Sequence, residues 1–181
     1  MKRAGILFAI LLLPMPFTAN ADECPLSAPV KMNDKQVLAL QLISEQTVTL
    51  SMADLDKLPQ TTITSERRNQ SSNTSGNPDV QTVTWTGVLL KDILLKNGLD
   101  KIDDHAVRQY HFEAIATDGY RGIFSWGELF NTSMGDQILV ITKMNGANLD
   151  KQAGPLALRA LADNRPGPRH VRNLCGISAI R

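Results

Sequence analysis

The amino-acid sequence predicts an α+β protein with a mostly antiparallel or mixed β-sheet. Segments with strand character outnumber those with helical character. The pairs Asp118-Gly119 and Asn145-Gly146 are strong hairpin-turn signals between such segments. The few helical segments are short, and two of them begin at recognisable capping residues. This combination is typical of one domain in which strands pair locally and helices cover part of a sheet.

Residues 1–21 predict a secretory signal peptide. Lys2 and Arg3 precede an apolar run, and small residues up to Ala21 offer a cleavage site. The apolar run is too short for a typical membrane span, although an uncleaved anchor is the alternative. We therefore expect an exported, periplasmic protein whose mature chain, residues 22–181, is a single domain that does not insert into the membrane.

The strands are expected where apolar and β-branched residues alternate or cluster, over residues 37–42, 47–50, 61–65, 107–117, 120–124, 138–142, 154–158 and 177–180, with a further strand ending at 82–84. Between two of them lies the polar stretch 65–79, SERRNQSSNTSGNPD. A loop of this length is usually functional or disordered, and its composition favours disorder.

Three short helices are expected. Ser51 and Asp54 form a variant of a capping box, and Ser125 and Glu128 form a second one that opens a helix through Phe130. The third helix covers residues 88–97 and ends before Gly98, a typical C-terminal capping residue. In this interpretation Trp85 lies at the corner between a strand and the third helix, where it either covers the core or forms one wall of a pocket.

The two cysteines of the chain are Cys24 and Cys175. In an oxidising compartment an even pair favours one disulfide bond. The alternative is a buried free Cys175 beside a loose Cys24, because the sequence gives no distance between them. The three histidines, His105, His111 and His170, belong to no short ligand motif, so no metal site is predicted.

Charge is unevenly distributed along the mature chain. Loss of the signal peptide changes the formal net charge from +1 to −1, which argues against a nucleic-acid partner. From residue 159 onward, however, five arginines accompany a single acidic residue, Asp163. Within this segment Arg169 and Arg172 present two guanidinium forks that suit a phosphate or a carboxylate. The alternative is a solvated basic surface in which Asp163 is a partner.

Four segments carry recognisable motifs: WTGVLLKDILLKNGL (85–99), ATDGYRGIFSWGEL (116–129), MNGANLDKQAGPLAL (144–158) and PGPRHVRNLCGI (166–177). In this order and spacing they resemble the molybdopterin-binding domain of the sulfite oxidase family. The first is similar to the family's W-x-G-x-x-L-x-x-L-L element, and the second to its D-G-Y stretch. The last resembles the P-G…R-x-V-K segment that helps hold the pterin cofactor and its phosphate. The resemblance implies a compact sulfite-oxidase-type fold.

The chain departs from this family in two places. Family enzymes hold molybdenum through a cysteine thiolate soon after the strand that follows L-P, and here residues 65–68 contain no cysteine. Glu and Ser are not equivalent to that soft donor, so no bound molybdenum is expected. Asn173 also replaces a family tryptophan.

The resemblance therefore implies an exported protein that holds a pterin or molybdopterin-like ligand, with no tightly bound cofactor and without molybdenum catalysis. Small exported relatives that report pterins to a membrane sensor imply a sensor protein as the partner. The alternatives are a molybdopterin-dependent oxidoreductase with atypical metal ligation, and an interaction module that has lost the ligand. The candidate ligand-binding residues are Arg67, Arg68, Trp85, Asp118, Tyr120, Arg169, His170 and Arg172.

Overall fold

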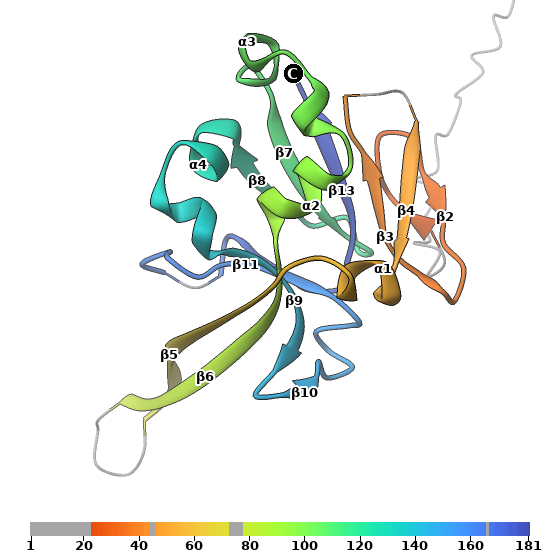
Figure 1. Cartoon of the computed structure of the whole chain (residues 1–181). Coiled ribbons are helices and arrows are strands. Elements are labelled where there is room, and N and C mark those ends of the chain that lie inside the picture. Colours follow the sequence, from red (N-terminus) through yellow and green to blue (C-terminus); the bar gives the residue numbers. More distant parts are fainter. Residues whose placement is uncertain (1–22, 44–45, 73–77, 166) are drawn as a thin grey trace, which may run out of the picture.

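The computed structural model describes residues 23–43, 46–72, 78–165 and 167–181, and it confirms the α+β class. Two β-sheets and several short helices form the body of the molecule (Figure 1). The predicted signal peptide and its cleavage site lie outside the described residues. Within the described ranges, no helix is both long enough and apolar enough to cross a membrane.

One sheet contains β3 (Gln36–Gln41), β4 (Thr47–Ser51), β7 (His111–Ala116), β8 (Arg121–Ser125) and β13 (Leu174–Ile180). Their order across the sheet is β4-β3-β13-β7-β8. The central strand β13 is parallel to β3 and antiparallel to β7, so the sheet is mixed. Beside it, β1 (Glu23–Cys24) and β2 (Val30–Lys31) form a small antiparallel pair.

The second sheet contains β5 (Gln60–Ser72), β6 (Pro78–Leu89), β9 (Ile138–Met144), β10 (Ala147–Asn148), β11 (Ala157–Ala160) and β12 (His170–Val171). Its order is β12-β11-β9-β6-β5, with β10 paired to β9, and every pair is antiparallel. The β5–β6 hairpin extends well beyond the body of the molecule in Figure 1.

Close approach of β6 to β9 requires a glycine. The register of the pair shifts between Thr86 and Gly87. A Cβ atom at Gly87 would lie 2.0 Å from the Val140 carbonyl oxygen, a distance that no side chain permits. The glycine of the W-x-G motif is therefore needed for sheet packing, and its position marks a β-bulge.

The helices are α1 (Met52–Asp56), α2 (Leu90–Lys96), α3 (Asp104–Val107) and α4 (Trp126–Phe130), with 3₁₀ turns η1 (Leu99–Lys101) and η2 (Ser133–Gln137). Both predicted capping boxes are present. The Ser51 and Ser125 hydroxyls accept hydrogen bonds from the third-residue backbone N–H groups of Asp54 and Glu128, and those carboxylates accept the serine N–H groups in return. The helix α2 ends before Gly98, which has the expected positive φ of 105°.

The main core lies between the two sheets and is closed by the helices. Phe112 and Phe124 enter it from the five-stranded sheet, Val140 enters from the six-stranded sheet, and Ile93 enters from α2. All four side chains are fully buried. This shared apolar cluster supplies the main driving force that fixes the sheets against each other.

Two expectations about β5 and β6 were wrong. The polar stretch 65–79 is not a disordered loop as a whole, because β5 continues to Ser72 and β6 begins at Pro78. The strand before α2 also continues to Leu89, so Trp85 lies within a strand and not at a strand–helix corner. In both places cross-strand pairing determines the structure, and the local composition does not reveal it.

The expected strand over residues 107–117 begins later than predicted. The helix α3 ends at Val107, the first residue of the expected strand, and β7 starts only at His111. The Asp103 carboxylate accepts hydrogen bonds from the backbone N–H groups of His105 and Ala106, which opens this helical turn.

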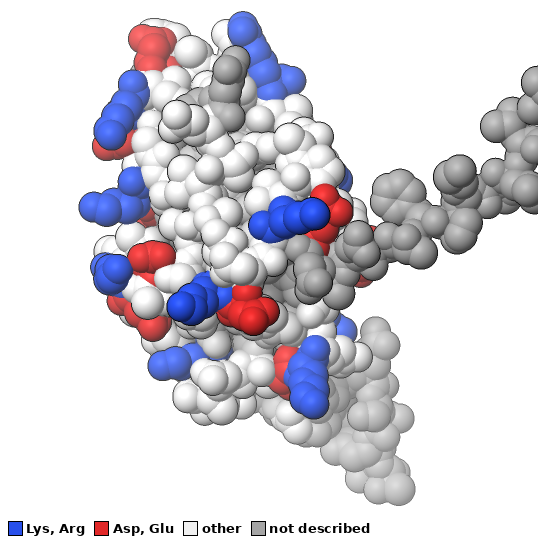
Figure 2. All heavy atoms as spheres, turned by 90° about the vertical axis from the view of Figure 1, so that its right-hand side faces the viewer, with Lys and Arg blue, Asp and Glu red and all other residues white. Residues whose placement is uncertain are grey.

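Charge on one face of the molecule agrees with the nearly neutral composition. On the face shown in Figure 2, basic and acidic side chains are interspersed, and neither sign forms a continuous patch. That face therefore lacks the basic stripe that is typical of nucleic-acid-binding surfaces.

Candidate functional site

One surface pocket is lined by two segments that lie far apart in the sequence. Asp118 and Tyr120 come from the turn between β7 and β8, and Gly167, His170 and Arg172 come from the segment around β12. The pocket volume is about 310 Å³, near the lower end of the usual range for small-molecule sites. The fold thus brings together Asp118, Tyr120, His170 and Arg172, all of which were candidates from the sequence.

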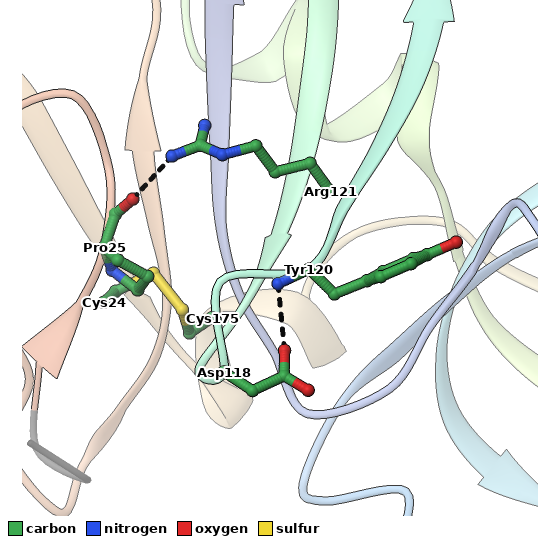
Figure 3. The surroundings of a disulfide bond; sticks show 6 residues. All are labelled: Cys24, Pro25, Asp118, Tyr120, Arg121 and Cys175. Atoms are coloured by element: carbon green, nitrogen blue, oxygen red, sulfur yellow. Dashed lines mark hydrogen bonds between the residues drawn. A yellow bond between two sulfur atoms is a disulfide. The ribbon is translucent and has the colours of Figure 1, made fainter. Parts of the chain in front are cut away.

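Hydrogen bonds join the two segments that line the pocket. The Tyr120 hydroxyl donates to the Pro168 carbonyl oxygen at 2.7 Å. The Thr117 N–H donates to the Asn173 carbonyl oxygen at 3.1 Å. In Figure 3 the Tyr120 ring extends away from the neighbouring disulfide. Since these bonds connect residues next to the lining on both segments, the pocket walls are held in a fixed relation.

The turn that carries Asp118 has the conformation that Asp-Gly predicts. Gly119 has a φ of 86°, and its N–H donates to the Ala116 carbonyl oxygen at 2.9 Å. One carboxylate oxygen of Asp118 accepts the Tyr120 N–H at 2.9 Å, as Figure 3 shows. This local bond fixes the carboxylate at the pocket and leaves its second oxygen available to a ligand.

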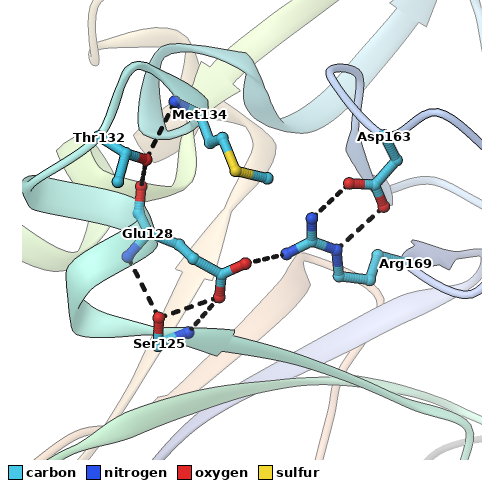
Figure 4. Close-up of polar contacts among 6 residues, drawn as sticks. All are labelled: Ser125, Glu128, Thr132, Met134, Asp163 and Arg169. Atoms are coloured by element: carbon cyan, nitrogen blue, oxygen red, sulfur yellow. Dashed lines mark hydrogen bonds and ion pairs between the residues drawn. The ribbon is translucent and has the colours of Figure 1, made fainter.

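Arg169 does not line the pocket, although the sequence placed it beside Arg172 as an anchor. Its Nε donates to Asp163 at 2.9 Å, and a terminal nitrogen donates to Glu128 at 2.5 Å (Figure 4). The guanidinium carbon also lies 5.5 Å from the centre of the Phe124 ring. The partnership with Asp163 is the alternative that the sequence left open. These contacts fasten the pocket-lining segment to α4.

The pKa values of Glu128 and Arg169 are both shifted where these two side chains meet. Burial favours the neutral form of Glu128, but the Ser125 backbone N–H and Arg169 outweigh it and hold the pKa of Glu128 below its ordinary 4.5. Hydrogen bonding to Asp163 raises the pKa of Arg169. Glu128 and Arg169 are therefore both charged at neutral pH.

We expect the Glu128→Gln variant to be about 1 kcal/mol less stable than wild type at pH 7, a figure reduced for partial exposure. Because the folded-state pKa of Glu128 is lowered, its contribution is fully present above pH 4.5 and is lost as the pH falls through that lowered value. The stability gap between the two proteins should therefore shrink on acidification from pH 7 to pH 3 in thermal unfolding experiments.

The control for this prediction is Asp136→Asn, which removes an exposed carboxylate paired with Lys91. Exposed ion pairs contribute little to stability, so this variant should be as stable as wild type at every pH. If the stability difference between Glu128→Gln and wild type stays constant or widens toward pH 3, the lowered pKa assigned to Glu128 is contradicted.

Trp85 covers the outer face of the six-stranded sheet and does not line the pocket. It is 4% exposed and packs in a second apolar cluster with Leu139 and Ile141. Its indole N–H donates to the Ser65 hydroxyl at 2.8 Å. Of the two roles considered for this ring, its position supports covering a core.

Arg159 was not among the sequence candidates, but it packs against Trp85 and is paired in the sheet with His170, a residue of the pocket lining. Its guanidinium carbon lies 5.1 Å from the centre of the Trp85 ring. In the ladder Arg159 lies directly opposite His170, so both side chains lie on one face of the sheet. The signal available in the sequence was an arginine between Leu158 and Ala160 in an otherwise apolar strand.

Arg67 and Arg68 have backbones in β5, opposite Gln81 and Val80. Their side chains lie outside what the structure describes, so their candidacy as ligand-binding residues stays a prediction.

The predicted disulfide between Cys24 and Cys175 is present. Because the chain has two cysteines, no thiolate is left for molybdenum, and the donor set does not fit thiolate ligation of that metal. Among the described residues, no three His, Cys, Asp or Glu side chains gather as they would around a metal ion.

Comparisons with known proteins agree with this fold. A family model described as an oxidoreductase molybdopterin binding domain matches residues 26–181. The crystal structure of the sulfane dehydrogenase SoxCD from Paracoccus pantotrophus is similar, with a TM-score of 0.59 and 14% identity. The match covers 83% of this chain and 39% of that one, and at this identity it shows the fold alone. No curated protein matches the sequence. The match over residues 26–181 places the chain in the family of sulfite oxidase-type molybdopterin binding domains.

Proposed function

We propose that this chain is an exported binding protein that holds a pterin or a molybdopterin-like ligand in the pocket described above. The observation that carries the proposal is that two motif segments of the family, around Asp118 and around Arg172, converge on one pocket. Membership of a molybdopterin-binding family supports a ligand of the pterin class. The resemblance to small exported relatives also favours a membrane sensor as the protein that reads the bound state.

The chemistry of the lining suits a flat, polar heterocycle. Tyr120 is 45% exposed and offers a ring face for stacking. The Asp118 carboxylate accepts hydrogen bonds, and the exposed guanidinium of Arg172 donates them. No hydrogen bond or ion pair joins that guanidinium to another residue in the described ranges. A phosphate on the ligand would add charge-assisted bonds to Arg172.

Binding without molybdenum catalysis is part of the proposal, and the disulfide supports it because the sulfur atoms of the two cysteines are bonded to each other. The second candidate is a molybdopterin-dependent oxidoreductase with atypical metal ligation, which family membership favours. Elemental analysis of the protein purified from its native compartment separates the two. About one molybdenum per chain would support the oxidoreductase and overturn the binding-only proposal.

Arg172→Ala is expected to weaken pterin binding about tenfold or more, because it removes a charged hydrogen-bond donor worth about 1.5–3 kcal/mol. Calorimetric titration with a pterin measures the affinity, and circular dichroism checks that the fold is intact. Arg165→Ala is the matched control, since Arg165 is an exposed arginine of the same segment that does not line the pocket. If wild type and Arg172→Ala bind the pterin with equal affinity, the binding site lies elsewhere on the protein.

A further inference from the structure

The pocket contains an acidic group that an anion-binding site would not need. Arg172 by itself would suit a phosphate or carboxylate, and a carboxylate beside it weakens the attraction for any anion. Asp118 nevertheless lines the same pocket, and its side chain is held there by the Tyr120 N–H at 2.9 Å. A ligand that uses both residues must present hydrogen-bond donors to Asp118 and acceptors to Arg172.

We infer that Asp118 recognises the amino-amide edge of a 2-amino-4-oxopteridine and thereby selects pterins over 2,4-dioxopteridines; this rests on the proposed function. On that edge the exocyclic amine and the neighbouring ring N–H are adjacent donors. An ionised carboxylate accepts from both, since the oxygen bonded to Tyr120 keeps a second lone pair. The C4 carbonyl oxygen, which follows the ring N–H on the side away from the amine, is an acceptor suited to Arg172.

The turn around Asp118 is built to hold this carboxylate in place before a ligand arrives. Gly119 adopts the positive φ that the tight turn requires, and the Thr117 N–H is bonded to the Asn173 carbonyl. The carboxylate therefore loses little freedom on binding, which favours selectivity as well as affinity.

A 2,4-dioxopteridine has the same size and shape as a pterin, but it places a carbonyl oxygen where the pterin has its amine. That oxygen would face the Asp118 carboxylate, so two acceptors would meet with no proton between them. A site that donates or accepts a specific hydrogen bond rejects an analogue that lacks the complementary group, because its own polar group is left unpaired.

The test compares the binding of pterin and lumazine, the 2-amino-4-oxo and 2,4-dioxo pteridines, to the full mature protein by titration calorimetry. Wild type should bind pterin about tenfold or more tightly than lumazine. In Asp118→Asn the amide keeps an oxygen for the Tyr120 N–H and can offer an N–H to the lumazine carbonyl. We expect this variant to lose the preference, with weaker pterin binding and unchanged or stronger lumazine binding.

Asp150→Asn is the matched control. Asp150 is an exposed aspartate that also accepts a turn N–H, from Ala153 at 2.8 Å, and it lies outside the pocket. This variant should keep the wild-type preference. If wild type binds pterin and lumazine equally, or if Asp118→Asn keeps the preference, the inference is overturned while the proposed function stands. If wild type binds neither compound, the proposed function fails as well.

Discussion

Removal of the Cys24–Cys175 disulfide is expected to lower the free energy of unfolding by about 4–5 kcal/mol. The bond joins residues 151 positions apart, so it restricts nearly all of the unfolded chain. Loop-closure entropy grows with loop length, which places this bond near the upper end of the usual range. Both cysteines are also packed in a small apolar cluster with Leu26 and Ile115.

Urea unfolding of wild type and of the double variant Cys24→Ala/Cys175→Ala measures this effect. Wild type should lose comparable stability when a reductant is added during unfolding. The double variant serves as the control, because its midpoint should not respond to the reductant. A loss below about 1 kcal/mol in both experiments would mean that residual structure in the unfolded state already restrains the chain.

Gly87→Ala is expected to destabilise the fold by about 3 kcal/mol or more, at the upper end of overpacking effects. The added Cβ would lie 2.0 Å from the Val140 oxygen and 2.9 Å from the Ile141 Cα. Because both are backbone atoms, no side-chain rotation relieves the overlap, and β6 must separate from β9. The second apolar cluster, which contains Trp85, would open with it.

Gly127→Ala is the matched control for this prediction. At Gly127 the nearest atom to an added Cβ is the Ser125 hydroxyl oxygen at 4.0 Å. Gly127 lies in α4, where alanine is favoured over glycine by about 0.5–1 kcal/mol, so the variant should be neutral or slightly stabilised. Urea midpoints measure both variants. A Gly87→Ala protein within about 0.5 kcal/mol of wild type would show that the two strands shift apart at little cost.

Features encoded within a few residues could be predicted from the sequence. The capping boxes at Ser51 and Ser125 and the turns at Asp118-Gly119 and Asn145-Gly146 all formed as expected. Each depends on contacts between residues no more than four positions apart, so the sequence carries the whole signal.

Features that depend on distant partners could not be predicted in this way. The arms of the β5–β6 hairpin are polar, and their pairing with each other overrides a composition that favours a loop. The end of β6 was misplaced because Gly87 is explained only by Val140, a residue of another strand. These errors arose because the residues that pair with each other lie far apart in the sequence.

In the candidate site, too, the roles that depend on distant partners were the ones missed from the sequence. Asp118 and Arg172 were proposed from a resemblance, and the fold places them in one pocket. The role of Arg169 was obscured because one of its partners, Glu128, lies 41 residues away in the sequence. Arg159 was overlooked because only the register of β11 and β12 places it opposite His170.

The position of β13 determines when this protein can fold. It is the central strand of its sheet, yet it follows β3, β4, β7 and β8 in the chain. The ribosome therefore makes the edges of the sheet before its centre. Until β13 arrives, β3 and β7 each have one row of unpaired backbone groups facing the gap. This sheet can consequently be completed only after β13 has been made, and a chain that stops before β13 exposes two open strand edges prone to aggregation.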